Sequence, residues 1–203
     1  MRSFLRVAAS VSILVAGLVA ALPAAAQDKP APVDTLPKKD RLAYFAELSA
    51  NGAAGTARKT RPVDARPAVP GEVVVTIIAG EGLETRSKPA KEGDWVVRNR
   101  CPATGNEEIL VSAEKFPTRH GEPLGEPDVD GYREFRPKGS EMAYVIARSS
   151  DAEFAIEAPW GELQRVRPGD AIVQVPEDPQ DTYRIQADAF ACTYEILEEA
   201  KAP

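Results

Sequence analysis

Two stretches of this 203-residue chain share an ordered series of features, and this internal repeat restricts the fold more than any other property of the sequence. Each stretch opens with Gly-Asp, continues through an apolar run, a polar loop and a second run, and reaches a helical turn containing Phe. The positions that define the repeat are Gly93, Asp94 and Phe116 in the first copy and Gly169, Asp170 and Phe190 in the second. Chance readily supplies one Gly-Asp pair but not the whole series, so we interpret it as a duplication.

Each copy has the pattern of a β-hairpin followed by a short helical turn. The runs at 108–111 and 182–186 follow loops rich in Pro, Gly, Asn and Asp, which indicates hairpins longer than the two-residue type. Residues 112–116 and 187–190 then resemble single helical turns. Further strands are predicted upstream of these hairpins, at 73–78, 142–147 and 154–158.

These elements predict a mainly β fold (α+β with short helical turns). Two similar β-hairpin-containing repeats are expected to pack as one compact domain with approximate twofold symmetry. A unit of about 60 residues buries proportionally little surface, and pairing two units provides a larger core. We assign the first β repeat to 72–121 and the second to 132–197, joined by an acidic connector at 122–131 and followed by a C-terminal tail at 198–203.

The N-terminal segment has the composition of a secretory signal peptide. Arg2 and Arg6 precede an apolar run at 7–22, and three alanines end the segment at residue 26. The alternative is an uncleaved membrane anchor, but the run is short for a span of roughly 20 residues. We therefore assign 1–26 as a cleaved signal peptide and expect a soluble periplasmic protein with no membrane span after cleavage.

Residues 27–71 are rich in Pro and Gly, and we predict a tether there. A short helix is expected at 40–50, because Leu42, Phe45 and Leu48 recur at three-residue spacing and Asp40 provides a cap. That helix is interpreted as a nascent helix in a linker, with a partner-binding amphipathic helix as the alternative.

The composition excludes several classes of function. One His and two Cys do not supply a multi-His metal site, a zinc ribbon or an iron–sulfur cluster, and no cofactor is predicted. A net charge of -6 argues against sequence-independent binding to nucleic acid, which depends on displacing counterions from phosphates. The partner is expected to be an envelope protein or small molecule, and the oligomeric state is not predicted.

Cys101 and Cys192 are the only cysteines. Because an exported protein enters an oxidising compartment, they are candidates for a disulfide that links the two copies. The alternative is two separate thiols, one of them buried.

Few polar residues are candidates for chemistry. Asp94 and Asp170 recur at matched positions, but Asp after Gly typically bonds the backbone of its own turn. His120 aligns with Tyr194, which favours a structural role. The acidic segment 128–131 lacks EF-hand spacing and is interpreted as a solvated connector.

Two tryptophans are candidate pocket aromatics. Trp95 and Trp160 do not occupy equivalent positions in the two copies. Aromatic core packing is the more common role of such side chains.

The repeated pattern resembles a small bacterial and phage domain called the PGDYG domain. The second copy matches through Pro168-Gly169-Asp170, Asp188-Ala189-Phe190 and Thr193-Tyr194-Glu195. The first copy matches through Gly93-Asp94-Trp95 but lacks the preceding Pro. The resemblance implies two divergent tandem copies of an uncharacterised domain and implies no activity.

We expect an exported, non-enzymatic binding, scaffold or accessory protein of the bacterial cell envelope. The alternative is a periplasmic hydrolase that uses Asp94, Asp170 or Glu114 in a cleft between the copies. Convergent carboxylates with strongly shifted pKa values in one cleft favour the enzyme, whereas carboxylates scattered at turns favour the binding protein.

Overall fold

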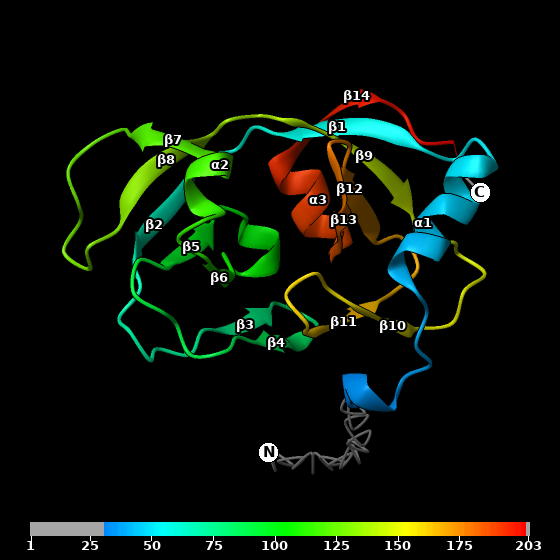
Figure 1. Ribbon diagram of the computed structural model, residues 1–203, viewed down its shortest axis with the longest axis horizontal. Coiled ribbons are helices and arrows are strands. Elements are labelled where there is room, and N and C mark those ends of the chain that lie inside the picture. Colours follow the sequence, from blue (N-terminus) through cyan, green and yellow to red (C-terminus); the bar gives the residue numbers. More distant parts are fainter. Residues whose placement is uncertain (1–30, 202–203) are drawn as a thin grey trace, which may run out of the picture.

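The computed structural model describes residues 31–201, so the predicted signal peptide at 1–26 lies outside the described residues (Figure 1). The fold is mainly β, with two five-stranded antiparallel sheets. The first sheet has the order β6-β5-β2-β8-β7, from β2 (Val63–Pro67), β5 (Trp95–Asn99), β6 (Glu108–Val111), β7 (His120–Pro123) and β8 (Arg133–Pro137). The second has the order β13-β12-β9-β1-β14, from β1 (Gly55–Lys59), β9 (Glu141–Ile146), β12 (Ala171–Val175), β13 (Asp178–Ile185) and β14 (Tyr194–Glu198).

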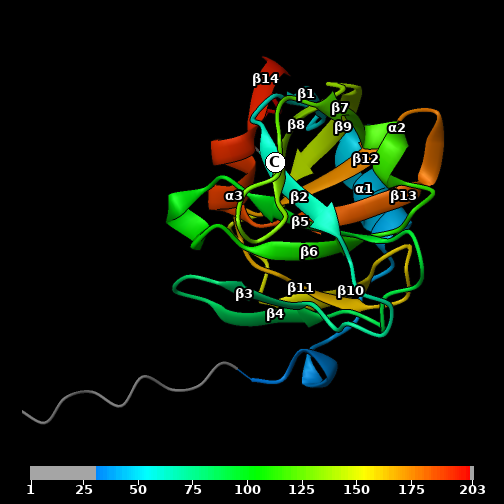
Figure 2. The same cartoon turned by 90° about the vertical axis from the view of Figure 1, so that its left-hand side faces the viewer.

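Two further hairpins form a layer beneath the sheets (Figures 1 and 2). They are β3 (Val75–Ile78) with β4 (Gly82–Arg86), and β10 (Phe154–Glu157) with β11 (Leu163–Val166). A hydrogen bond of 3.1 Å from Lys88 Nζ to the Trp160 carbonyl joins the two hairpins. The helical elements are η1 (Val33–Thr35), α1 (Arg41–Ala50), η2 (Pro102–Thr104), α2 (Phe116–Arg119) and α3 (Ala187–Thr193).

If the chain is divided between β7 and β8, each sheet has four strands from one half of the chain and one strand from the other half. Strand β1 precedes β2 in the sequence but lies in the second sheet, between β9 and β14. Strand β8 precedes β9 but lies in the first sheet, between β2 and β7. The chain therefore crosses between the sheets twice, once after β1 and once after β8.

The core is built where apolar side chains on the strand faces meet the helices. Phe116 of α2 packs with Val63 and Val97 of the first sheet. Phe190 of α3 packs with Tyr144 and Val173 of the second sheet. In both halves, the phenylalanine predicted from the repeat anchors a short helix to its sheet.

Helix α1 is present at the predicted position, and Asp40 caps it by accepting the N–H groups of Leu42 and Ala43. Its buried side chains include Phe45 and Leu48, which join the core cluster of Val145. The apolar face of α1 is therefore covered by the body of this chain.

The region predicted as a tether contributes strands to both sheets. β1 and β2 lie inside 27–71, and both are internal strands of their sheets. Pairing with strands far away in the sequence overrides the local preferences of Gly and Pro there. The predicted connector at 122–131 also differs, because β7 extends into it as far as Pro123.

No helix among residues 31–201 is long and apolar enough to cross a membrane.

Candidate functional site

The first Gly-Asp pair organises a turn and the segment that follows the hairpin. Gly93 has a φ of 84°, a region that favours glycine. The Asp94 carboxylate accepts the Lys91 N–H at 2.8 Å and the Ala113 N–H at 3.0 Å. Asp94 thereby fixes the turn into β5 and the start of the segment leading to α2.

The second Gly-Asp pair, Gly169-Asp170, makes the equivalent backbone contacts and one additional side-chain contact. Asp170 accepts the Arg167 N–H at 2.8 Å and the Ala187 N–H at 3.1 Å, and Gly169 has a φ of 90°. The additional contact is from Arg184 Nε to Asp170 Oδ2 at 2.8 Å. Asp170 is therefore also the counterion of a buried guanidinium.

Arg184 is the centre of an ionic cluster, and its side chain is fully buried. Its guanidinium also donates to Glu81 Oε2 at 3.2 Å and to Glu84 Oε1. Arg184 and Asp170 belong to the second sheet and its turn, whereas Glu81 and Glu84 belong to the β3–β4 hairpin. The cluster therefore attaches this hairpin to the second sheet.

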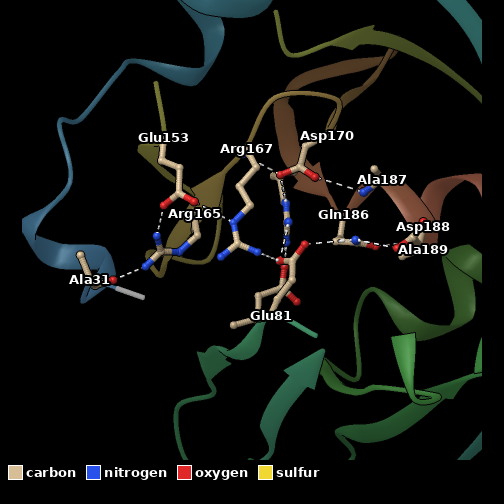
Figure 3. A network of polar contacts seen from close by, with 12 residues as sticks. Ala31, Glu81, Glu153, Arg165, Arg167, Asp170, Gln186, Ala187, Asp188 and Ala189 are labelled. Atoms are coloured by element: carbon tan, nitrogen blue, oxygen red, sulfur yellow. Dashed lines mark hydrogen bonds and ion pairs between the residues drawn. The ribbon is translucent and has the colours of Figure 1, made fainter. Parts of the chain in front are cut away.

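The cluster extends through further charged groups (Figure 3). Arg167 pairs with Glu81 at 3.0 Å and with Glu153 at 2.9 Å. Gln186 Nε2 donates to Glu81 Oε1 at 3.1 Å, and Arg165 pairs with Glu153. Among the ion-paired groups, the carboxylates outnumber the guanidinium groups by one. They are Asp170, Glu81, Glu84 and Glu153 against Arg165, Arg167 and Arg184.

Burial, more than the excess of negative charge, affects the titration of two acids in the cluster. Burial raises the pKa of Glu84, and the attraction of Arg184 only partly offsets it. Burial raises the pKa of Asp170 in the same way, with Arg184 again opposing the shift. The folded state therefore disfavours the ionised forms of Glu84 and Asp170. Each of the cluster's three guanidinium groups is paired with a carboxylate, which is typical of a structural network and leaves no unpaired cation among these residues to polarise a substrate.

We expect Glu84→Gln to stabilise the protein at neutral pH. Because the pKa of Glu84 is raised above 4.5 in the folded state, its ionised form disfavours folding, and this penalty disappears as the pH falls below 4.5. The amide oxygen of Gln still accepts from Arg184. Urea unfolding at several pH values should show a higher midpoint near pH 7 and a flatter pH dependence. Glu126→Gln, on the exposed connector, is the control, and an equal response of both variants would contradict the assignment.

A second buried network contains Lys59, from the end of β1. Its Nζ donates to Asn99 Oδ1 at 2.7 Å, and Asn99 Nδ2 donates to Glu107 Oε1 at 2.8 Å. The Thr104 hydroxyl completes the network by donating to Glu107. Desolvation lowers the pKa of Lys59 to about 8, although the Glu107 charge opposes the shift. Since Lys59 belongs to the second sheet and Asn99 to the first, this network joins the two sheets.

His120 lies beside this network, and its described contacts are with Phe116. Its ring stacks on Phe116 at a centroid distance of 4.6 Å, and Nδ1 lies 3.3 Å from the Phe116 carbonyl oxygen. Burial, with a contribution from Lys59, lowers the pKa of His120 to about 4. His120 is therefore neutral at pH 7 and packs within the first sheet.

The two tryptophans have different environments. Trp95 stacks on Phe116 at 4.2 Å and meets the edge of Phe135 at 5.6 Å, so it is part of the first core. Trp160 follows β10 and is 42% exposed, with its ring 5.6 Å from that of Tyr183. Only Trp160 presents a substantial aromatic surface to solvent.

The predicted disulfide is absent, and both cysteines are free thiols. Cys101 Sγ lies 3.7 Å from the Asp188 carbonyl oxygen, and Cys192 Sγ lies 3.8 Å from that of Arg100. Each sulfur is thus directed at a carbonyl oxygen across the boundary between the halves. The two thiols are neighbours, since Cys101 contributes to the raised pKa of Cys192, but they form no disulfide. The prediction of a bond was wrong, because compartment and cysteine count do not determine whether the sulfur atoms reach bonding distance.

We expect two thiols per chain in alkylation experiments. The unfolded protein without reductant should take up two iodoacetamide groups by intact mass. The folded protein should react slowly, because Cys101 is buried and burial raises the pKa of Cys192, which favours the unreactive thiol. A sample reduced beforehand should give the same count. Absence of adducts on the unfolded, unreduced chain would contradict the assignment.

The acidic connector forms its own turn. The Asp128 carboxylate accepts the N–H groups of Asp130 and Tyr132, both at 2.9 Å. Among residues 31–201, no group of three or more His, Cys, Asp or Glu side chains is arranged to hold a metal ion.

Sequence reasoning missed Arg184, Glu81 and Glu84, although the repeat contains a signal for Arg184. Ile172 faces Arg184 across β12 and β13, and Val96 faces Leu110 across β5 and β6. Arg184 in the second copy therefore occupies the position that Leu110 has in the first copy. Such a difference at a buried position indicates an ion pair with a partner from elsewhere in the chain.

The β3–β4 hairpin has an apolar surface on the side away from the sheets. Ile77 and Leu83 are direct cross-strand partners, and they are 58% and 62% exposed. Val75 and Arg86 form the neighbouring pair on this side. We call these four residues the outer hairpin face. Side chains on the other side, such as that of Ile78, are buried.

Comparisons with known proteins found no matching family model, no matching curated protein and no matching solved structure.

Proposed function

We propose that this chain is an exported, non-enzymatic binding or accessory protein of the bacterial cell envelope. The main support for the proposal is that the candidate carboxylates already form structural hydrogen bonds in turns. Asp94 and Asp170 each accept two backbone N–H groups in turns of different sheets, and Asp170 also neutralises Arg184. Groups engaged in this way do not serve as a paired general acid and base.

The exposed apolar residues support the same proposal. Ile77 and Leu83 face solvent on a hairpin that the Arg184 cluster holds against the second sheet. A contiguous exposed apolar surface is typical of an interaction site. A rigidly attached hairpin binds a partner with little loss of conformational entropy.

We further propose that the body is a tandem pair of PGDYG-like units that exchange their first strands. Residues 55–123 carry β1 to β7, and residues 133–198 carry β8 to β14. With β8 taken as the counterpart of β1, the two sheet orders correspond strand by strand. The matching contacts of Asp94 and Asp170 support the duplication.

The proposal is tested by native purification of the protein from the periplasmic fraction, followed by mass spectrometry. We expect the N-terminus of the purified protein to be Gln27 and a partner to be present at a fixed stoichiometry. A cytoplasmic protein with an intact N-terminus would overturn the export part.

The hydrolase alternative makes a different prediction. The purified protein would release soluble fragments from isolated cell-wall material, and Glu114→Gln, Asp94→Asn or Asp170→Asn would abolish the release. That result would overturn the binding function. We expect no release from the wild-type protein.

A further inference from the structure

The outer hairpin face has a neighbour that is already covered by an extended segment of this chain. Residues 37–39 run parallel to β10: the Ala155 N–H donates to the Pro37 carbonyl at 2.8 Å, and the Lys39 N–H donates to the Ala155 carbonyl at 2.9 Å. Further along, Arg165 of β11 donates to the Ala31 carbonyl. The edge of β10 therefore pairs with the extended residues 37–39, and η1 (Val33–Thr35) and Ala31 lie further along the same hairpin.

The β3–β4 hairpin lies in the same layer as β10 and β11 (Figures 1 and 2). The bonds from Lys88 to the Trp160 carbonyl and from Arg167 to Glu81 fix the two hairpins beside one another. The outer hairpin face thus lies on a hairpin whose neighbour already pairs with an extended segment, residues 37–39. Among residues 31–201, however, no segment covers Ile77 and Leu83.

The segment that pairs with the β10–β11 hairpin does not also cover the β3–β4 hairpin. Residues 37–39 are bonded to Ala155, and a second copy of the chain would have its own segment engaged in the same way. Residues 37–39, in this chain or in a second copy, are therefore not the occupant of the outer hairpin face.

The charge on this face indicates the chemistry of that segment. Arg86 is exposed and forms no hydrogen bond or ion pair with the described residues, and Lys91 is exposed nearby in the chain. A carboxylate on the partner would find its counterion at Arg86, while apolar side chains would pack on Ile77 and Leu83.

We propose that the outer hairpin face binds an extended segment of a partner protein that presents apolar side chains to Ile77 and Leu83 and a carboxylate to Arg86. This inference rests on the proposed binding function and specifies where the partner binds. Ile77 and Leu83 are directly opposite one another across the hairpin, so one apolar side chain of the segment can contact both.

The test is selection from a phage-displayed library of random 12-residue peptides against the purified full chain. We expect enriched peptides that combine apolar residues with Asp or Glu. Their affinity should fall at least tenfold for the Ile77→Asp/Leu83→Asp variant and for Arg86→Glu. It should be unchanged for Val129→Asp, because Val129 is an exposed apolar residue on the connector. Bound peptide should slow amide hydrogen exchange at residues 75–86.

Several outcomes would overturn the inference. They are selection of no peptide family, peptides that bind the Ile77→Asp/Leu83→Asp variant normally, and protection confined to residues outside 75–86. Circular dichroism of each variant verifies folding. A wild-type protein that floats with phosphatidylglycerol vesicles through Ile77 and Leu83, and selects no peptide, would assign the face to a membrane instead. A partner that co-purifies but cross-links elsewhere would refute this inference and leave the proposed function intact.

Discussion

Arg184→Met is expected to remove about 3–5 kcal/mol from the free energy of unfolding, a large share of the total for a domain of this size. The substitution keeps the volume of the side chain but leaves Asp170, Glu81 and Glu84 without their shared cation. Three carboxylates in a desolvated cluster repel one another, so the β3–β4 hairpin should detach first. Urea unfolding followed by circular dichroism measures the loss.

The matched control is Arg58→Met, which removes the same kind of side chain from an exposed pair. Arg58 and Glu195 are 43% and 49% exposed, and such pairs contribute about 1 kcal/mol or less. Adding Glu84→Gln to Arg184→Met should recover part of the loss, because one of the uncompensated charges is removed. Equal effects of the two arginine variants would refute the central role of Arg184.

Gly55→Ala is expected to destabilise the protein by about 3 kcal/mol through overpacking. Gly55 lies in β1, and an added Cβ would be 2.7 Å from Tyr144 Cε1 and closer still to the backbone near Glu198 and Ala200. Because β1 is paired on both sides, the new methyl group must displace β14 or the Tyr144 ring. Thermal unfolding and amide exchange in residues 194–198 measure the effect.

Gly125→Ala is the control for this variant. Gly125 lies in the connector, and a Cβ there has no neighbour within 4 Å. Its stability should be unchanged or slightly increased, since alanine reduces the entropy of the unfolded chain. If Gly55→Ala behaves like Gly125→Ala, the close packing of β1 against β14 is incorrect.

Local sequence signals predicted the elements that depend on local contacts. The Asp40 cap determined the start of α1, and the run at 108–111 coincides with β6. The mainly β class was also predicted correctly.

The misassigned elements depend on contacts between distant residues. Nothing near Gly55 in the sequence indicates a strand, because its partners are around Tyr144 and Glu198. The charges of Glu81 and Glu84 are equally uninformative until Arg184 is placed beside them. The cysteines illustrate the same limit, since their number was known but their geometry was not.

The crossing of β1 and β8 between the sheets has a consequence for the order of assembly. The first sheet lacks an internal strand until residue 137 is available, and β1 has no partner until β9 at 141–146 has followed it. The N-terminal half therefore cannot complete its sheet before the strands of the C-terminal half are available. We expect the molecule to fold slowly and in a single step once nearly all of it is present, because these pairings span long stretches of sequence.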